Sequence, residues 1–366
     1  MNKLATILLM ICSWSVIADD RPWWSEPYPS TFDVSMLKTQ QHITVSGTVF
    51  VDENNQTFEF KGVSIADPDK LKQQGKWSKE IFEEVAEWGA NTIRLPIHPG
   101  AWRSVGKNDY FKMLDEAVVW ANALDLYLIL DWHSIGNMQA DLYQHPMYNT
   151  SFKETLQFWQ QVAFRYQNVP TIAVYELFNE PTNDFIGNGN NSLGRADWSV
   201  WRDMMEDLID LVRSYDTKVI PLVAGFNWAY DLSPVKQMPI QRENIAYAIH
   251  PYPQKAKPKE QTTENFFLLW QQQWGFVASR APMIATELGW SHESAPGAHV
   301  PTINNDGTYG PRIIDFMTQR GISWIAWVFD PEWSPQMISN WEYEPTEQGA
   351  FFKKVFQGDY QSANNE

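Results

Sequence analysis

The sequence predicts a single α/β domain built as a (β/α)8 TIM barrel, with a short N-terminal β-hairpin before it. Between residues 61 and 356, short runs of β-branched and apolar residues alternate about eight times with longer amphipathic stretches. The apolar runs repeatedly end in polar or charged residues, as expected where barrel strands end at a catalytic face. No GxGxxG segment follows the first run, which weakens an open nucleotide-binding sheet as the alternative.

The first 18 residues have the pattern of a secretory signal peptide. Lys3 supplies a positive start, Leu4 to Cys12 form a short apolar run, and Val16 to Ala18 resemble a small-residue cleavage site. The run is too short to span a bilayer comfortably, so we expect cleavage after Ala18, no membrane insertion, and a secreted or periplasmic protein. Cys12 could instead carry a lipid, but the bulky Ile11 before it disfavours this. Cys12 is the only cysteine, so the mature chain would hold no disulfide.

Residues 19–57 form the predicted N-terminal extension and hairpin, and residues 58–366 the predicted catalytic barrel. His42–Val51 and Thr57–Phe60 alternate like the strands of a hairpin. The predicted barrel strands are Lys61–Ile65, Asn91–Ile97, Leu126–Trp132, Ile172–Asn179, Lys218–Ala224, Ile245–His250, Met283–Glu287 and Ser323–Phe329. The predicted helices are Lys79–Trp88, Phe111–Leu124, Phe152–Tyr166, Trp198–Tyr215, Thr263–Ala278, Tyr309–Arg320 and Gln348–Phe356.

The composition narrows the class of ligand. The chain has 366 residues and a net charge of −16, which argues against nucleic acid as a partner because phosphates require basic surfaces. It holds 19 Trp, 14 Tyr and 20 Phe, and flat indole rings are surfaces on which sugars stack. No linker rich in Ser, Thr or Pro separates a second module. We therefore expect a monomer that handles a neutral polysaccharide or oligosaccharide.

Two glutamates stand at equivalent ends of predicted strands. IAVYELFNEP runs into Glu180 after strand four, and PMIATELGW places Glu287 at the end of strand seven. Closing a barrel brings these two strand ends to one mouth. Two carboxylates about 5–5.5 Å apart support double displacement, in which one attacks the anomeric carbon while the other protonates the leaving oxygen.

Three residues at neighbouring strand ends can control those carboxylates. Arg94 ends strand two, and a fixed cation near Glu287 would keep that carboxylate ionised. His250 and Tyr252 leave strand six in the segment AIHPYP. Tyr252 can hydrogen-bond Glu287, and His250 can orient the network around Glu180.

Three others can face the sugar. Asn179 can donate its amide to the sugar 2-hydroxyl, a contact expected to strengthen in the transition state. His133, which ends LILDWHS, can anchor hydroxyls at the cleavage site, and Trp327 in WIAWVFD can form a floor under the ring. Each of these residues alone would more often have a structural role, but all of them fall at the ends of strands in one repeated strand-helix pattern.

The ordered set resembles glycoside hydrolase family 5, which contains cellulases, mannanases and related retaining β-glycanases. The set is Arg94, His133, Asn179-Glu180-Pro181, His250-x-Tyr252, Glu287 and Trp327. The resemblance runs from about residue 58 to residue 356 and implies a (β/α)8 barrel. It also implies that Glu180 is the acid/base, that Glu287 is the nucleophile, and that the other residues support them.

Several further residues are candidates for substrate contact or support. Three tryptophans lie shortly beyond strands five, seven and eight and are possible sugar platforms: Trp228, Trp290 and Trp333. The segment RLPIHPGAW adds His98 and Trp102 as subsite candidates. Asp131, which precedes His133 by two positions, is interpreted as a supporting acid rather than a catalyst.

The sequence predicts no metal and no cofactor. Residues 183–197 and 304–309 are rich in Asn, Asp and Gly, but they lack the ordered ligand spacing of a calcium loop and are interpreted as loop structure. No cluster of His and Cys is typical of zinc.

The leading hypothesis is therefore a secreted retaining hydrolase of β-1,4-linked glucan, resembling an endoglucanase or cellulase. A β-mannanase or another β-glycanase, including an exo-acting one, is the alternative within enzymes. A non-catalytic carbohydrate-binding protein is the alternative from another class, and its mark would be the loss of a glutamate or of Arg94. Within the leading hypothesis we expect the pKa of Glu180 to be raised, because a nearby carboxylate disfavours its ionised form.

Overall fold

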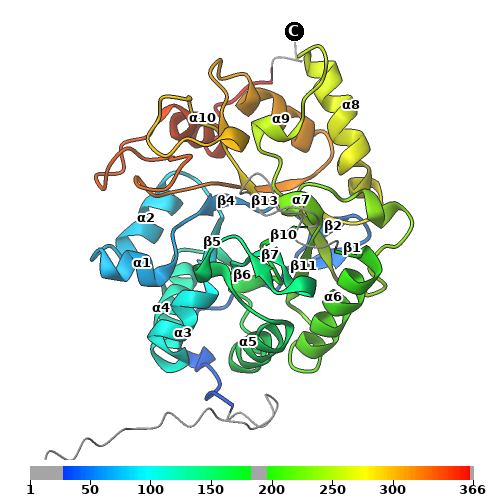
Figure 1. Ribbon diagram of the computed structural model, residues 1–366. Helices are drawn as coiled ribbons and strands as arrows, with labels where there is room; N and C mark the ends of the chain where they lie inside the picture. The colour runs from blue at the N-terminus through cyan, green and yellow to red at the C-terminus, as the bar shows by residue number, and fades with distance from the viewer. Residues whose placement is uncertain (1–27, 183–195, 363–366) are drawn as a thin grey trace, which may run out of the picture.

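The computed structural model describes residues 28–182 and 196–362, so the predicted signal peptide lies outside the described residues. The predicted (β/α)8 barrel is confirmed, because eight parallel strands pair in a closed ring in which β14 meets β4. In sequence order they are β4 (Lys61–Ser64), β5 (Thr92–Ile97), β6 (Tyr127–Trp132), β9 (Ile172–Glu176), β11 (Ile220–Ala224), β12 (Ala246–Ile249), β13 (Met283–Leu288) and β14 (Ser323–Ala326). Figure 1 shows these strands at the centre with the helices around them.

The seven predicted helices are present. The α-helices in the described residues are α1 (Pro68–Gln73), α2 (Lys79–Glu87), α3 (Pro99–Val105), α4 (Lys107–Ala123), α5 (Phe152–Arg165), α6 (Trp198–Arg213), α7 (Phe226–Ala229), α8 (Thr263–Gln273), α9 (Tyr309–Thr318) and α10 (Glu347–Phe356). Of these, α1, α3 and α7 are short helices that were not predicted. The 3-10 helices are η2 (Val34–Met36), η3 (Met138–Ala140), η4 (Pro146–Tyr148), η5 (Ser233–Lys236), η6 (Pro253–Lys255), η7 (Gly275–Ser279) and η8 (Val300–Thr302). The predicted helix at 263–278 ends early, because the backbone leaves helical geometry at Trp274 and continues as η7.

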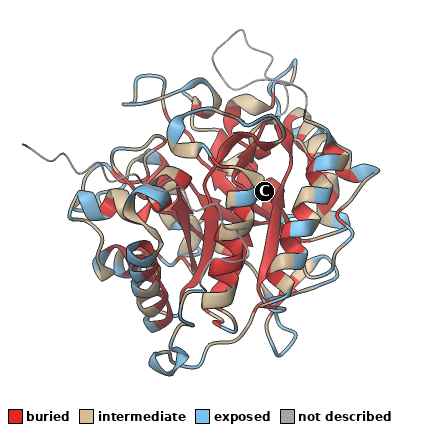
Figure 2. Ribbon diagram, turned by 60° about the horizontal axis from the view of Figure 1, so that its bottom comes forward, coloured by how far each residue is buried: buried red, intermediate tan, exposed pale blue. Residues whose placement is uncertain are grey.

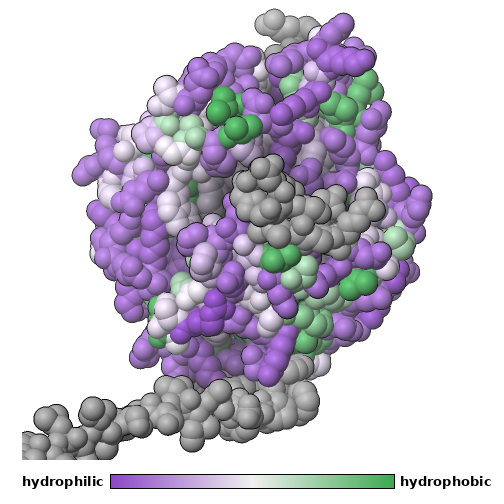
Figure 3. Space-filling model, in the orientation of Figure 1, coloured by the Kyte–Doolittle hydropathy of each residue, from purple (hydrophilic) through white to green (hydrophobic). Residues whose placement is uncertain are grey.

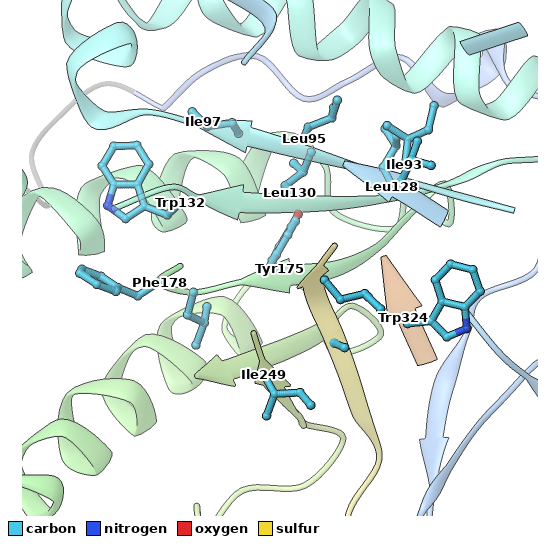
Figure 4. Packing of buried hydrophobic residues seen from close by; sticks show 14 of the residues in the cluster. Ile93, Leu95, Ile97, Leu128, Leu130, Trp132, Tyr175, Phe178, Ile249 and Trp324 are labelled. Atoms are coloured by element: carbon cyan, nitrogen blue, oxygen red, sulfur yellow. The ribbon is translucent and has the colours of Figure 1, made fainter. Parts of the chain in front are cut away.

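Alternation along the strands separates two apolar layers. Outward-facing side chains of β5 and β6 pack against the surrounding helices, and Figure 4 shows part of this layer. Its labelled members on those two strands are Ile93, Leu95, Ile97, Leu128, Leu130 and Trp132. Inward-facing side chains such as Ile129, Leu222 and Ile325 form a second buried cluster inside the barrel. Figure 2 shows the same division, with buried strands at the centre and exposed residues on the outer faces of the helices.

The predicted hairpin is present, but the strand predicted over residues 42–51 turns at Gly47, where φ is 61°, and so forms two strands. β1 (Thr44–Ser46), β2 (Val49–Val51) and β3 (Thr57–Phe58) form an antiparallel sheet. Phe50 and Phe58 each meet Phe60 edge to face, at ring centroid distances of 5.0 and 4.9 Å. Phe50 and Phe60 belong to the same buried cluster as the barrel interior. The sheet therefore closes the end of the barrel opposite the strand ends that carry the polar residues.

A second small sheet lies where the barrel strands end. It consists of β10 (Glu180–Pro181), β7 (Ile135–Asn137) and β8 (Leu142–Tyr143), in that order. Because β10 begins with Glu180, this sheet holds one of the two predicted catalytic carboxylates.

The visible surface of the molecule is predominantly hydrophilic, with small separate hydrophobic areas (Figure 3). Within residues 28–182 and 196–362, every helix is too short or too polar to cross a bilayer.

Candidate active site

Glu180 and Glu287 lie at one mouth of the barrel, where both line a cavity of about 870 Å³. A carboxylate oxygen of each, together with a ring nitrogen of His250, falls within 4.8 Å of the others. Both glutamate side chains are largely buried. The two acids, which are 107 positions apart (287 − 180), therefore meet as the strand pattern predicts.

Departures from strict strand alternation aim both carboxylates at the cavity. Thr286 points into the barrel, where its hydroxyl donates to Glu176 at 2.7 Å, so perfect alternation would turn Glu287 outward. The pairing of β13 with β14 shifts register between Ala285 and Leu288, and this irregularity redirects Glu287 to the mouth. On the other side, β9 ends at Glu176, and Glu180 restarts as the first residue of β10.

Glu287 is held by two donors. An Arg94 guanidinium nitrogen lies 3.1 Å from Oε1, and the Tyr252 hydroxyl donates to Oε2 at 2.8 Å. Burial and the neighbouring Glu180 raise the pKa of Glu287, while His250, Arg94 and Tyr252 oppose the increase. The predicted contacts of Arg94 and Tyr252 with Glu287 are thus present.

Glu180 is paired with His250. The His250 Nδ1 lies 2.8 Å from Glu180 Oε1, and its Nε2 lies 3.0 Å from the Thr286 hydroxyl. Burial by itself would raise the pKa of Glu180, but the hydrogen bond and charge of His250, with Lys255 and Arg94, lower it. The expected rise was wrong, because the nearest charged neighbour of Glu180 is an imidazole rather than the other carboxylate.

A buried ion cluster fixes Arg94 behind the two glutamates. Arg94 is fully buried and contacts Asp131 at 2.9 Å, Glu176 at 2.7 Å and Glu287 at 3.1 Å. Burial would lower the pKa of Arg94, but these three carboxylates together raise it, so the guanidinium stays charged. Asp131 also accepts from His133 Nδ1 at 2.5 Å, which agrees with its predicted supporting place.

Glu176 belongs to this cluster and was not among the residues predicted from the sequence. The signal was present, since a glutamate inside the apolar run IAVYEL must be paired if the strand is buried. Tyr148 was missed as well. It stands on η4, outside the predicted strands and helices, and its side chain lines the cavity.

Asn179 is poised for a polar ligand. Its Oδ1 accepts from Arg94 at 2.7 Å, which orients the amide. Its Nδ2 is buried and has no hydrogen-bond partner. Because a buried donor without a partner is costly, this group fits the predicted contact with a sugar hydroxyl.

Aromatic rings form one wall of the cavity. Trp327 lies nearly parallel to His133, at 5.6 Å and 3°, and to Trp333, at 6.1 Å and 16°. All three rings line the cavity, as does Trp228 from α7. These four predicted residues are therefore brought together with the two glutamates.

Three candidates lie elsewhere. Trp290 is only 3% exposed, packs against Tyr309 and Phe352 in the core, and does not line the cavity, so its prediction as a sugar platform was wrong. Trp102 is a buried residue of α3 that packs in the core and does not line the cavity. His98 is buried behind the wall, with Nδ1 2.8 Å from Asp67.

The site contains one potential metal-ligand set among the described residues, namely Glu180, His250 and Glu287. The set already holds the charge of Arg94, 3.1 Å from Glu287, and that of the protonated His250, so a metal cation is disfavoured there. Of the predicted loops, residues 183–195 lie outside the described residues. In the other loop the Asp306 carboxylate accepts from the Thr308 amide and hydroxyl, as expected for loop structure.

Gly136 is predicted to control the position of Glu180. A Cβ at this position would lie 2.4 Å from the Leu142 carbonyl oxygen, so β8 would have to move away from β7. β7 also pairs with β10, where the Gly136 carbonyl accepts from the Thr182 amide at 2.9 Å. Because small displacements of reacting groups are expensive, we expect Gly136→Ala to lower kcat by roughly 10–100-fold.

The matched control is Gly275→Ala, which crowds the Phe316 ring at 2.8 Å in η7, away from the cavity. It should change the melting temperature but leave kcat within about twofold. Equal kcat values for Gly136→Ala and the wild type would contradict the positioning of Glu180 by β7.

His250 predicts a pH dependence of stability. Although burial lowers its pKa, Glu287, Glu176 and Glu180 outweigh that effect and raise it to about 9. The stabilisation from the extra bound proton is therefore complete below the unfolded pKa of about 6.5 and is lost as the pH rises through 9. Urea unfolding between pH 6 and 9.5 should show a loss of stability that is smaller in His250→Gln. Lys255, whose pKa burial lowers to about 8, titrates with the opposite sign, so the difference between the two proteins is the quantity to compare.

Known proteins resemble this chain in sequence and structure. Residues 51–332 match the family model described as Cellulase (glycosyl hydrolase family 5). Endoglucanase N of Pectobacterium atrosepticum is 24% identical over 81% of this chain and 59% of its own length. For Endoglucanase 5 of Pectobacterium carotovorum subsp. carotovorum the identity is 23%, over 81% of this chain and 52% of its own. The chain thus spans little more than half the length of these relatives.

A solved structure is more similar. The β-glucanase SdGluc5_26A from Saccharophagus degradans is 57% identical and superimposes with a TM-score of 0.88, covering 92% of this chain and 99% of its own. The same β-glucanase has also been solved in complex with cellotetraose.

Proposed function

The chain belongs to glycosyl hydrolase family 5, and on that premise we propose that it hydrolyses β-1,4-linked glucan by double displacement with retention of configuration. The observation that carries the proposal is the approach of the Glu180 and Glu287 carboxylate oxygens within 4.8 Å. Retaining enzymes place their two carboxyl groups about 5–5.5 Å apart, whereas inverting enzymes need about 6.5–9.5 Å to admit a water.

In the first step, a Glu287 oxygen attacks the anomeric carbon while the bond to the leaving sugar breaks. Before this happens the proton at the 2.8 Å contact with His250 passes to Glu180, which gives it to the departing oxygen and is left as a carboxylate. In the second step, Glu180 takes a proton from water, the water oxygen attacks the anomeric carbon, and Glu287 leaves as a carboxylate. Esterification of Glu287 removes its charge, which favours Glu180 in the proton-accepting role.

The remaining cavity residues support these steps. Arg94 and Tyr252 hold Glu287 in line for attack, and both contact it directly. Asn179 Nδ2 donates to the sugar 2-hydroxyl, a contact that strengthens in the transition state. Trp327 lies under the sugar, which it contacts with its ring face.

The choice of glucan is supported by the 57% identical β-glucanase, which this chain matches over 99% of that protein's length. The test is hydrolysis of carboxymethylcellulose, lichenan, laminarin, xyloglucan and mannan, with product analysis. We expect cleavage of the substrates with β-1,4-linked glucose and a β-configured first product by NMR. Preferential cleavage of mannan would replace glucan by mannan as substrate, a first product of α configuration would overturn retention, and oligosaccharide binding without any product would indicate a carbohydrate-binding protein.

We also propose that residues 1–18 direct export and are removed after Ala18. N-terminal sequencing of the protein recovered from the periplasm or medium tests this, and Asp19 as the first residue is the expected result. We also predict that the protein is a monomer, and light scattering of the same preparation tests this.

A further inference from the structure

Lys255 is a cation in the cavity whose charge helps to lower the pKa of Glu180, but the proposed steps give it no direct part. It ends η6, three positions after Tyr252, and its half-buried side chain lines the cavity. Its ammonium donates to the Asn227 carbonyl at 2.9 Å and lies 4.8 Å from the centre of the Trp228 ring. Lys255 therefore contacts the turn that carries Trp228 in two ways, through the Asn227 carbonyl and over the Trp228 ring.

That turn has an unfavourable backbone conformation. Asn227, Trp228 and Ala229 have φ values of 58°, 56° and 53°, in the left-handed region that side chains normally avoid. Such a conformation persists only where surrounding contacts hold it. Besides that of Lys255, the contacts that hold the turn include the Trp228 Nε1 bond to Gln144 at 3.0 Å and the bond from the His250 amide to the Ala229 carbonyl at 2.8 Å.

The turn lies on the side of the cavity where the leaving sugar departs. α7 packs against β10, whose first residue is Glu180. Because Glu180 protonates the glycosidic oxygen, the leaving sugar must lie next to it. Trp228 is therefore placed beside the leaving sugar, while the parallel rings of His133, Trp327 and Trp333 form a separate wall.

We propose that Lys255 is a positioning residue for the leaving-group side, which holds the left-handed turn so that Trp228 presents its ring to the departing sugar. This inference rests on the proposed glycoside hydrolysis. Lys255 thus acts through Trp228. Its contribution to turnover should appear only with substrates whose leaving group is a sugar.

The experiment compares Lys255→Met with the wild type on lichenan and on β-cellobiosyl fluoride, whose leaving group is a single atom. We expect kcat/KM on lichenan to fall on the order of tenfold, mainly through KM, and the value for the fluoride to stay within about twofold. Lys255→Arg should recover part of the loss on lichenan, because it keeps both the charge and a donor.

Lys236→Met is the matched control, because Lys236 also donates to a carbonyl, that of Gln272 at 2.8 Å, and lies 4.5 Å from the Phe276 ring centre, but outside the cavity. It should leave both substrates unchanged. Trp228→Ala is the second variant, and adding Lys255→Met to it should cause no further loss.

Three results would overturn the inference. Wild-type kinetics of Lys255→Met on both substrates would remove it, as would an equal loss on lichenan and the fluoride, or losses that add in the double variant. Failure of the wild type to cleave any glucan would instead overturn the proposed function, and this inference with it.

Discussion

Replacement of Glu287 by Ala is expected to lower kcat on glucan by about 10⁴-fold or more, because in the proposed mechanism its carboxylate forms the covalent intermediate. The Glu287 carboxylate is aligned by Arg94 and Tyr252, and its oxygen lies within 4.8 Å of one on Glu180. The measurement is initial rates on lichenan, with circular dichroism to check that the variant is folded.

Azide rescue identifies which carboxylate is the nucleophile and which is the acid/base. In Glu287→Ala it should restore turnover by attacking the β-linked sugar directly, which gives an α-glycosyl azide. In Glu180→Ala with an activated substrate, it should attack the glycosyl-enzyme and give a β-glycosyl azide. The opposite pair of products would exchange the two roles.

Glu332→Ala is the control for these variants, since Glu332 also lines the cavity but its side chain is 54% exposed. Its kcat should remain within about threefold of the wild type, as for a carboxylate outside the reacting pair. A similar loss in Glu332→Ala would show that any acid at this mouth affects turnover, and it would contradict the specific role of Glu287.

Replacement of Arg94 by Met should cause the largest loss of stability. The guanidinium is fully buried among Asp131, Glu176 and Glu287, with contacts of 2.7 to 3.1 Å. Its removal leaves three buried carboxylates without their common cation, for which we expect a loss of about 3–5 kcal/mol in the free energy of unfolding. Urea denaturation measures this loss, and activity should fall as well because Glu287 loses a direct partner.

Arg103→Met is the matched control. Arg103 pairs with Glu154 at 2.8 Å, but its side chain is 43% exposed, so its replacement should cost less than about 1 kcal/mol. Glu176→Gln added to Arg94→Met should restore part of the stability, because it removes one uncompensated charge. Equal losses in Arg94→Met and Arg103→Met would show that the buried cluster does not depend on its cation.

Much of the fold followed from periodicity, and the reason is visible in the strands. Inward and outward positions alternate along β5 and β6. Apolar runs such as TIRLPI and YLILDW can therefore be recognised as strands without knowing which other strands lie beside them. Their polar interruptions, Arg94 and Asp131, mark the inward face. Glu176 ends β9 and belongs to the same inward face, where it contacts Arg94, but it was not predicted as a site residue.

The local sequence pattern did not predict the direction of side chains that lie beyond the end of a strand. Trp228 and Trp290 follow their strands at similar spacing, yet Trp228 faces the cavity and Trp290 packs against Tyr309 and Phe352. A left-handed turn directs the first, and packing against α9 and α10 encloses the second. Neither cause is visible in the few residues around each tryptophan.

The sequence alone determined which residues end the barrel strands and therefore that Glu180, Glu287 and Asn179 meet at its mouth, because strand period and barrel closure are properties of the chain order. Only the tertiary structure decided which tryptophans face the cavity and in which direction the pKa values of the two glutamates shift. The pKa values of Glu180 and Glu287 depend on His250 and Arg94, which come from other strands, and electrostatic energies follow distance in space rather than separation along the chain.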